Sequence, residues 1–594
     1  MNAPLPLRPE TPVDVDAGAP RFGSDVIADT LRALDIPFVV LNPGASYRGL
    51  HDSLVNHLGN HDPQMLLCLH EESAVAIAHG YAKVTGKPLA VAVHSNVGLF
   101  HATMAIFNAW CDRMPVIVLG ATGPVDAARR RPWIDWIHTA RDQGAIVRGY
   151  VKWDDQPASP SAAREALLRA AWLARAQPCA PVYVNFDAHL QEAPLDAALP
   201  PIDPARYRPG AAAFVSHDEL DTAAKLLAGA RRPLILAGRA SRHLDAWNAR
   251  VNLAEKLHAR VLTDLKVGAA FPTDHALHAA PPSVLTSAEM AAQIAQSDVI
   301  LSLDWVDLAG TLHVGFKGEA TAKVIHVSLD HTLHNGWSMD HQGLPPVDLL
   351  LQCDPDAVVP ALVQRLPARP AAAGAGVSSP PRYTPPAPEA KPDTDALAHA
   401  LRDVVGTRAV SLSHLPLSWN GASWPLRHPL DFLGSDGGGG IGAGPGLAVG
   451  AALALRGTDR LPVAICGDGD YLMGVTALWT ATHYGIPLLL IVANNNSFYN
   501  DEVHQERVAR MRGRPVENKW IGQRIDDPAI DLARLAEAQG ALGIGPVSRM
   551  AELREAFTRA VEAVERGRVA VVDVRIVPGY TPSMAAALTP GKTR

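Results

Sequence analysis

Residues 463–500 constrain the fold of this chain more than any other stretch. Two short apolar runs, 463–466 and 488–493, flank a segment with the apolar spacing of a buried helix. A helix between two such runs predicts a right-handed parallel strand–helix–strand unit. Its strands end at the same edge of one sheet, which is where open α/β sheets bind ligands. We therefore expect Asp468 and Asn495, which follow these strands, to lie close together.

The polar residues after the two strands offer oxygen atoms to a metal ion. Asp468 supplies a carboxylate, Asn495 an amide oxygen and Ser497 a backbone carbonyl. Mg²⁺ prefers such ligands and fills the rest of its shell with water and phosphate oxygens. The alternative is that these residues only form the turns that end the strands, because Gly, Asp and Asn all favour turns. The combination of Asp468 and Asn495 at this spacing favours a metal site over simple turns.

A phosphate group would fit the same loop. Gly467 and Gly469 allow it to approach the backbone closely, and the N–H groups that open the helix at Asp470 would face it. The segment is therefore interpreted as a clamp for Mg²⁺ and a diphosphate.

This arrangement of GDG, about two dozen residues and then NN resembles the cofactor-binding motif of thiamine-diphosphate-dependent enzymes. The resemblance implies thiamine diphosphate and Mg²⁺ as cofactors. It assigns the metal to Asp468, Asn495 and the Ser497 carbonyl. It also implies cofactor contacts from Gly467, Gly469, Asp470 and Asn495.

Composition sets the broad class. The 594 residues are 48% hydrophobic and 19% charged, with a formal charge of −7. This balance gives no electrostatic reason to expect nucleic-acid or membrane binding. The five cysteines lack metal-ligand spacing and indicate reduced thiols. Neither a signal peptide nor a membrane-spanning run is evident, so we expect a cytoplasmic protein.

Alternating apolar strands and helices predict an α/β fold with parallel sheets covered on both faces. We expect three tandem doubly wound domains, an arrangement that the resemblance shares: a pyrimidine-binding domain (22–190), a central domain (213–366) and a diphosphate-binding domain (395–594). Proline-rich stretches predict linkers at 191–212 and 367–394, and residues 1–21 are expected to form a flexible tail. The predicted strands are 38–41, 65–69, 89–94, 116–119 and 182–186, then 233–237, 259–262, 299–303 and 324–327. Helices are predicted at 24–34, with Ser24 as the N-cap, and at 472–484.

A glutamate pair opens the helix predicted at 71–84. An acid at a helix start is ordinarily a favourable interaction with the helix dipole. The segment LHEESAVAIAHGYA, however, resembles the glutamate helix of the family, and counting back from Gly80 selects Glu71. The resemblance implies that Glu71 hydrogen-bonds the aminopyrimidine ring of the cofactor. That role needs apolar surroundings, which residues 74–78 supply. Glu72 is expected to be exposed.

The glycine-rich stretch DGGGGIGAGPG spans residues 436–446. Gly437, Gly439 and Gly442 match the GxGxxG pattern of dinucleotide-binding proteins, but no convincing apolar strand leads into it, as that interpretation requires. The resemblance instead implies that Gly440 and Ile441 bind thiamine diphosphate, with Ile441 wedged between its two rings.

His94 follows a strand and precedes a helix that contains Asn108-Ala109-Trp110. This stretch resembles benzoylformate decarboxylase, where the histidine protonates and deprotonates substrate-derived intermediates. Substrate residues are less well matched. Ala45 stands where the family places a serine after Asn-Pro-Gly, and Ser46 comes one residue later. From the central domain, His313 is the candidate for a second histidine. His101 and His70 are less favoured than His94.

The resemblance implies decarboxylation of a 2-oxo acid by a homodimer or homotetramer with active sites between subunits. An acetolactate-synthase-like carboligase is the alternative. A non-catalytic cofactor-binding protein or an oxidoreductase also stays open. We expect the central domain to hold no nucleotide, because no glycine-rich turn follows its strands. The charged run 497–514 is interpreted as a solvated helix face or as a lid over the substrate channel.

Overall fold

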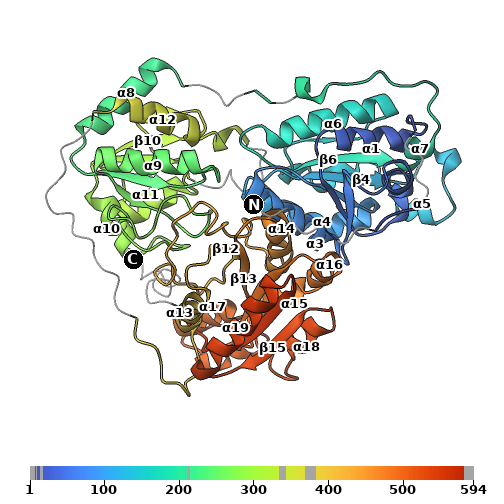
Figure 1. Ribbon diagram of the computed structural model, residues 1–594. Coiled ribbons are helices and arrows are strands. Elements are labelled where there is room, and N and C mark those ends of the chain that lie inside the picture. The colour runs from blue at the N-terminus through green and yellow to red at the C-terminus, as the bar shows by residue number, and fades with distance from the viewer. Residues whose placement is uncertain are drawn as a thin grey trace.

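The computed structural model describes residues 7, 10–13, 18–207, 209–210, 215–333, 343–367 and 383–580. These residues form three α/β units, each built on a parallel sheet, and the units sit at the corners of a triangle (Figure 1). This confirms the predicted fold class. The domain boundaries remain predictions, since parts of both linkers and most of the tail lie outside the described residues.

The first sheet has six strands in the order β2-β1-β3-β4-β6-β5. Its strands are β1 Phe38–Leu41, β2 Gln64–Leu67, β3 Ala90–Val93, β4 Ile117–Thr122, β5 Asp154–Asp155 and β6 Val182–Asp187. Helices α1 (Gly23–Ala33) and α6 (Pro160–Arg175) cover one face, and α3 (Glu71–Thr85) and α4 (Ser95–Cys111) cover the other (Figure 1). Short helices α2 (Arg48–Asp52), α5 (Ile134–Ile137) and α7 (Ala188–Glu192) lie in its connections.

The second sheet has five strands in the order β11-β10-β9-β7-β8. They are β7 Pro233–Ala237, β8 Arg260–Leu262, β9 Val299–Leu303, β10 Lys323–Val327 and β11 Leu349–Leu351. The helices of this unit are α8 His217–Gly229, α9 Leu244–Leu257, α10 Ala288–Gln296, α11 Leu308–Phe316 and α12 Pro355–Arg365.

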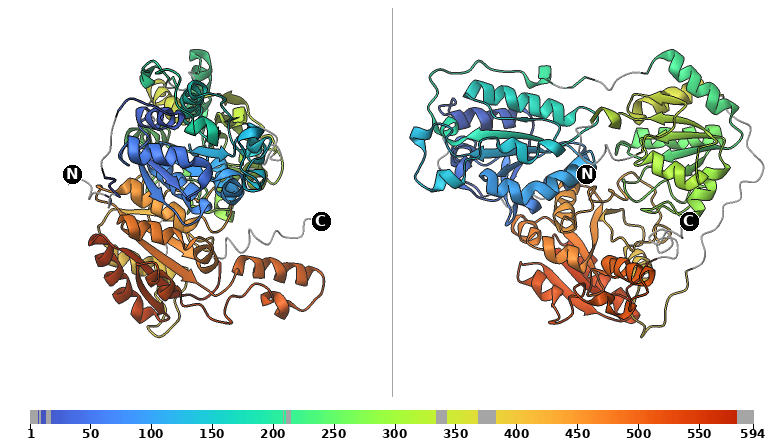
Figure 2. Two further views of the ribbon diagram at one scale, coloured as in Figure 1. Left: turned by 90° about the vertical axis from the view of Figure 1, so that its right-hand side faces the viewer. Right: turned by 180° about the vertical axis from the view of Figure 1, so that it is seen from behind.

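The third sheet has five strands in the order β12-β13-β14-β16-β15. They are β12 Val410–His414, β13 Leu461–Gly467, β14 Leu488–Asn494, β15 Leu542–Val547 and β16 Val569–Arg575. Its helices are α13 Thr394–Val405, α14 Gly444–Leu455, α15 Asp468–Gly474, α16 Ala477–Tyr484, α17 Tyr499–Met511, α18 Leu532–Glu537 and α19 Met550–Glu565. Helix α17 projects from this unit together with the 3-10 turn Val516–Trp520 (Figure 2).

Two local predictions are wrong. We expected Ser24 to cap the first helix, but α1 begins at Gly23, and the carboxylate of Asp25 accepts the N–H groups of Arg21 and Phe22 instead. The single helix expected after residue 471 is interrupted. Helix α15 starts already at Asp468 and ends at Gly474, before α16 begins.

Helices α3 and α14 join the first and third units along a seam of small residues. A Cβ atom added at Gly80 would lie 2.2 Å from the carbonyl oxygen of Leu447, and one added at Gly450 would lie 1.9 Å from that of Ile77. The two backbones therefore approach so closely that only glycine fits at these positions.

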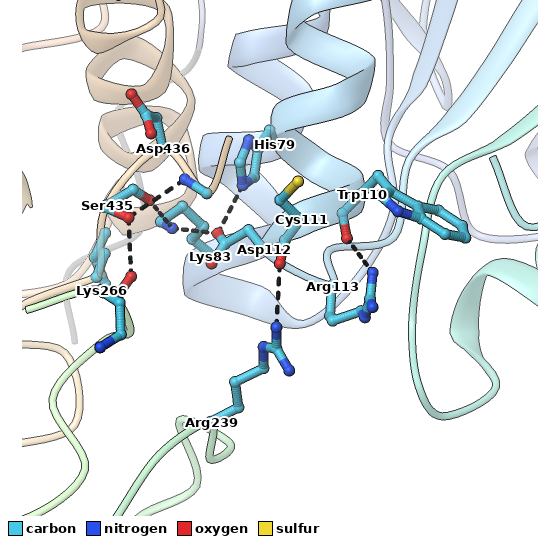
Figure 3. A network of polar contacts seen from close by, with 12 residues as sticks. His79, Lys83, Trp110, Cys111, Asp112, Arg113, Arg239, Lys266, Ser435 and Asp436 are labelled. Carbon is cyan, nitrogen blue, oxygen red and sulfur yellow. Dashed lines mark hydrogen bonds and ion pairs between the residues drawn. The ribbon is translucent and has the colours of Figure 1, made fainter. Parts of the chain in front are cut away.

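A buried polar network holds the three units together at one point (Figure 3). Asp112, at the end of α4, accepts hydrogen bonds from Lys83 and from His79 Nε2, the latter at 2.7 Å. Lys83 also donates to the carbonyl oxygen of Ser435 in the third unit, at 2.7 Å. Arg239 of the second unit donates to the carbonyl oxygen of Cys111 at 3.3 Å. The segment that leads into the glycine-rich stretch is thus anchored on the first unit.

The described part of the N-terminal segment contacts the body of the protein. Leu7 is buried, and the Glu10 carboxylate lies 3.1 Å from His483 Nε2. Within the described residues, the structure contains no helix that is both long enough and apolar enough to cross a membrane.

Candidate functional site

The structure brings Asp468 and Asn495 together at the carboxyl edge of the third sheet. Strands β13 and β14 pair in parallel with Gly467 opposite Ala493. One N–H group, that of Ser497, lies 3.1 Å from Asp468 Oδ2 and 2.9 Å from Asn495 Oδ1. The loop makes this turn through Asn496, whose φ is +58°. The two side-chain oxygens therefore converge on one backbone N–H group at this sheet edge.

The Asp468 carboxylate fits a cation site electrostatically. It is buried, and within the described residues no arginine or lysine pairs with it. Burial raises its pKa to about 6, although the N–H groups of Gly469 and Ser497 oppose this shift. A divalent cation would supply the missing positive charge. Together with Asn495 Oδ1 and the Ser497 carbonyl, the donor set consists of the hard oxygen atoms that Mg²⁺ prefers.

Asp470 acts on the glycine-rich stretch through its side chain. Its Oδ1 accepts the N–H groups of Gly442 at 2.6 Å and Gly444 at 3.2 Å, while Oδ2 lies 3.1 Å from His414 Nε2. Burial alone would raise the pKa of Asp470, but His414 and the two glycine N–H groups lower it below its usual value. Sequence reasoning considered only its backbone N–H and missed this function of the carboxylate.

The glycine-rich stretch is a chain of tight turns rather than the start of a nucleotide-binding unit. Gly437, Gly439 and Gly442 have φ values of +90°, +72° and +102°. These are the three glycines of the GxGxxG match, so left-handed backbone explains the pattern. Ile441 stands among them with 45% of its surface exposed. An exposed apolar side chain on a constrained loop is what a wedge against a ligand requires.

Glu71 is buried at the start of α3, with 7% of its surface exposed. Its Oε2 lies 3.1 Å from Nδ1 of His101, and its Oε1 would be 3.1 Å from a Cβ atom at residue 98, so Gly98 leaves room for the carboxyl group. His101 was rated an unlikely participant from sequence. The sequence feature that could have indicated His101 is its spacing of two helical turns from His94.

Glu72 was expected to be exposed, and this is wrong. The side chain is half-buried, and burial and the nearby Asp470 raise its pKa. Successive helical residues point about 100° apart. Glu71 therefore faces α4, whereas Glu72 faces the glycine-rich stretch of its own chain, 3.8 Å from the position of a Cβ atom at Gly442.

His94 sits at the carboxyl end of β3 and is held by Ser46. The serine Oγ is 2.9 Å from His94 Nδ1, and Ser46 is only 5% exposed, whereas Ala45 is exposed. The ring of His138 packs edge-on against His94 at 4.7 Å between centroids. Sequence reasoning missed His138, since it lies in a segment without a recognisable motif.

Two other predicted features stay apart from this group. His313 is exposed on α11, and among the described contacts it meets none of the site residues. On α17, Glu506 pairs with Arg510 at 2.6 Å and with Lys519 at 2.5 Å, which holds the charged run to the following turn. Neither role assigned to these residues is tested by the structure.

The carboxyl edge of the second sheet carries charges that are neutralised internally. Arg239 lies 3.6 Å from Asp304 and 3.3 Å from Asp330, and Arg113 of the first unit lies 2.5 Å from Asp330. Ser328 Oγ donates to Asp304 at 2.6 Å. That the central unit holds no nucleotide remains a prediction, and these ion pairs are consistent with it.

Comparison with family models matches all three units. Residues 21–146 match the thiamine pyrophosphate enzyme N-terminal TPP-binding domain, 220–362 the central domain and 417–574 the C-terminal TPP-binding domain.

Curated relatives are similar at low identity. A probable 2-ketoarginine decarboxylase of Pseudomonas aeruginosa is 26% identical over 510 residues, 83% of this chain and 84% of that protein. Benzoylformate decarboxylase of the same organism is 28% identical over 74% of this chain and 80% of its own length. The acetolactate synthase large subunit of Corynebacterium glutamicum is 25% identical over 92% and 85%.

Solved structures share the fold. A thiamine-diphosphate-dependent 4-hydroxybenzoylformate decarboxylase of Rhodococcus jostii aligns with a TM-score of 0.75 at 22% identity, covering 94% of this chain and all of that one. Benzoylformate decarboxylase of Polynucleobacter necessarius aligns with a TM-score of 0.76 at 22% identity, covering 95% of this chain and all of its own.

Proposed function

We propose that this chain, which belongs to the family of thiamine pyrophosphate enzymes, uses thiamine diphosphate and Mg²⁺ to decarboxylate a 2-oxo acid. The observation that carries the proposal is the single N–H group of Ser497, which lies within hydrogen-bond distance of both Asp468 and Asn495. It supports the proposal because it holds two side-chain oxygens, the proposed metal ligands, at one sheet edge beside a glycine turn that a phosphate could approach.

In this proposal the third unit holds the cofactor. Asp468, Asn495 and the Ser497 carbonyl bind Mg²⁺, and the backbone at Gly467, Gly469 and Asp470 faces the diphosphate. Gly440 and Ile441 support the ring system. When bound, thiamine diphosphate supplies a nucleophilic carbon and takes up the electrons that are released with CO₂.

The first unit supplies the proton chemistry. Glu71 is buried among apolar side chains of α3 and faces α4, where a carboxyl group can share a proton with a ring nitrogen. His94 stands at the neighbouring strand end and faces the substrate. The loop at Ala45 and Ser46 is assigned to substrate recognition, with His313 as a further candidate from another part of the assembly.

The exposed apolar side chains favour active sites between subunits. In the first unit they follow the carboxyl ends of the strands and include Leu69, Phe100, Trp133 and Trp136. In the third unit Ile441 and Met473 stand exposed at the corresponding edge, at 45% and 59%. Two apolar edges on one chain are what a homodimer would cover. We therefore propose a homodimer or homotetramer.

A carboligase that joins two carbonyl compounds is the second candidate function. It is favoured by the similarity to acetolactate synthase, which extends over 92% of this chain. The two candidates use the same cofactor site and differ in whether a proton or a second carbonyl compound reacts after CO₂ has left.

Purified full-length protein tests the proposal. Thiamine diphosphate and Mg²⁺ should be released on denaturation, and CO₂ should be formed from at least one member of a panel of 2-oxo acids that includes benzoylformate, 2-ketoarginine and pyruvate. Product analysis with one and with two carbonyl substrates separates decarboxylase from carboligase. A protein that binds no thiamine diphosphate at millimolar concentration would refute the proposal.

A further inference from the structure

We infer that Ser46 fixes His94 in the neutral tautomer that carries its proton on Nε2, so that His94 acts as a hydrogen-bond donor to the substrate rather than as a base. The catalytic part of this inference rests on the proposed function. The tautomer itself depends only on the contacts of this chain.

The contacts at Nδ1 determine where the proton lies. The backbone N–H of Ser46 is 3.3 Å from His94 Nδ1, and a backbone N–H can only donate. Nδ1 is therefore the acceptor. Because Nδ1 is an acceptor, the Ser46 hydroxyl, 2.9 Å away, donates its own proton to Nδ1 while it accepts the N–H of Ser95 at 3.1 Å. Two donors converge on Nδ1, which leaves Nε2 to carry the ring proton.

The surrounding backbone makes this arrangement rigid. The Ser46 carbonyl accepts Nε2–H of Gln191 at 3.0 Å, and Ser95 is fully buried with a φ of +45°. A Cβ atom on Gly44 would lie 2.0 Å from Cβ of His94, so the loop is pressed against the histidine. A buried non-glycine residue in the left-handed region persists only where its surroundings hold it firmly. The ring of His94 thus has little freedom to rotate away from Ser46.

Charged neighbours favour the neutral ring. The titratable groups that act on His94 are His138, Arg131 and Glu71. Burial lowers the pKa of His94, His138 and Arg131 lower it further, and Glu71 opposes them. These effects together favour the neutral imidazole over the protonated one.

The position of the proton decides the chemistry. In the described part of the chain, Nε2 of His94 has no hydrogen-bond partner, so its N–H is available to a ligand. To accept a proton at Nε2, the ring would first have to place a proton on Nδ1, against two donors that already point there. A fixed N–H group instead stabilises negative charge that develops on the carbonyl oxygen of the substrate. This differs from the acid–base role that the resemblance implies.

The shifted serine explains the difference. In the family pattern a serine directly after Asn-Pro-Gly contacts the substrate carboxylate. Here that position is Ala45, and the serine one residue later turns inward to His94. Ser46 is therefore a positioning residue that acts through His94.

Nitrogen NMR on the protein without cofactor tests the tautomer directly. With ¹⁵N-histidine labelling, the His94 signals are assigned as those lost in His94→Gln. We expect Nδ1 to show the shift of an unprotonated nitrogen and Nε2 that of a protonated one, from pH 6 to 8. In Ser46→Ala the two shifts should move toward the average of exchanging tautomers. A proton on Nδ1 in the wild-type protein would overturn the inference, whether or not the protein decarboxylates any substrate.

Kinetics of matched variants test the role of the N–H group. Glutamine in His94→Gln can donate an N–H but cannot transfer a proton, whereas His94→Phe offers neither. We expect His94→Gln to keep kcat within about 10-fold of wild type and His94→Phe to lose about 100-fold or more, the usual effect of removing one preorganised donor. Equal losses in both variants would show that His94 transfers a proton.

The pH profile supplies a further readout. The kcat/KM of the wild type should be constant through neutral pH and fall only in acid, as His94 becomes protonated. In Ser46→Ala one donor to Nδ1 is lost, so this acid limb should move up by about one pH unit. An unmoved limb would contradict the positioning role of Ser46.

Discussion

The carboxyl edges of the second and third sheets have the same construction and opposite electrostatics. Asp304 follows β9 in the one as Asp468 follows β13 in the other. Asp304 lies near Arg239 and accepts a hydrogen bond from the hydroxyl group of Ser328. Asp468 is buried, its partners among the described residues are backbone N–H groups, and burial raises its pKa to about 6. Among the described residues, the acid at the edge of the second sheet has a positively charged partner, and the acid at the edge of the third sheet has none.

This difference separates a structural edge from a binding edge. Removing one partner of a buried acid–arginine pair destabilises the fold, because it leaves an unpaired charge. A buried acid without such a partner costs stability unless a ligand compensates it. Substitutions at the second edge should therefore change stability, and substitutions at the binding positions should change cofactor binding or turnover.

The largest expected effect is that of Glu71→Gln. Like Asp468, Glu71 is a buried acid without an arginine or lysine partner among the described residues. The amide keeps the shape but cannot share a proton, so kcat should fall by about 100-fold or more while the circular dichroism spectrum is unchanged. Glu72→Gln is the matched control and should keep most activity. Unchanged turnover in Glu71→Gln would refute its assigned role.

Asp468→Ala should weaken cofactor binding next most strongly. It removes a proposed ligand of the metal, and even partners that only orient metal ligands contribute 10- to 100-fold to affinity in other proteins. We expect the apparent Kd for thiamine diphosphate with Mg²⁺ to rise at least ~100-fold, as measured by isothermal titration calorimetry. Asp304→Asn at the second edge is the control and should bind the cofactor as the wild type does. Equal affinities for both variants would remove the distinction between the two edges.

Arg239→Met should affect stability alone. It removes the arginine beside Asp304 and one of the arginines beside Asp330, which still pairs with Arg113. Breaking this partly buried pair should cost about 1–3 kcal/mol of unfolding free energy, measurable in urea. Exposed Arg232→Met should stay within ~0.5 kcal/mol of wild type. Cofactor affinity of folded Arg239→Met should be unchanged, and a clear loss would mean that the second edge takes part in binding.

The smallest expected effect is that of nucleotides. Millimolar FAD or ADP should leave Tm unchanged within about 1 °C, because a ligand raises Tm only if it binds the folded state. Thiamine diphosphate with Mg²⁺ should raise Tm by several degrees in the same assay. A nucleotide-induced rise would show that the ion pairs around Arg239 open to admit a ligand.

Much of the fold follows from local pattern. Parallel strands flanked by helices give apolar runs that can be read directly, and predicted strands such as 38–41 and 233–237 agree with β1 and β7 residue for residue. The meeting of Asp468 and Asn495 also follows, because adjacent parallel strands fix it. The pattern singled out neither β12 nor β16, although both lie in the third sheet.

Side-chain partnerships were not predictable in the same way. Ser46 and His94 are separated by 48 positions and meet only because two strand ends and a strained backbone at Ser95 bring them together. Asp470 reaches Gly442 across the start of α14, and no local signal distinguishes that carboxylate from an ordinary first-turn acid. The exposure of Glu72 was misjudged for the same reason, since the third unit that covers it is distant in sequence.

Helix α3 lies between α4 on one side and the glycine-rich stretch with α14 on the other. The side chains of Glu71 and Glu72 face opposite sides of the helix, and close contacts at glycine residues pack the rest of the helix against α14. A substitution that tilts α3 would therefore disturb both the proposed proton sharing by Glu71 and the loop around Ile441. Attempts to change substrate preference should therefore leave α3 unchanged and begin with the tryptophan-bearing turn at 133–137. Its Ile137 carbonyl accepts a hydrogen bond from Asn96, and the next residue, His138, packs against His94.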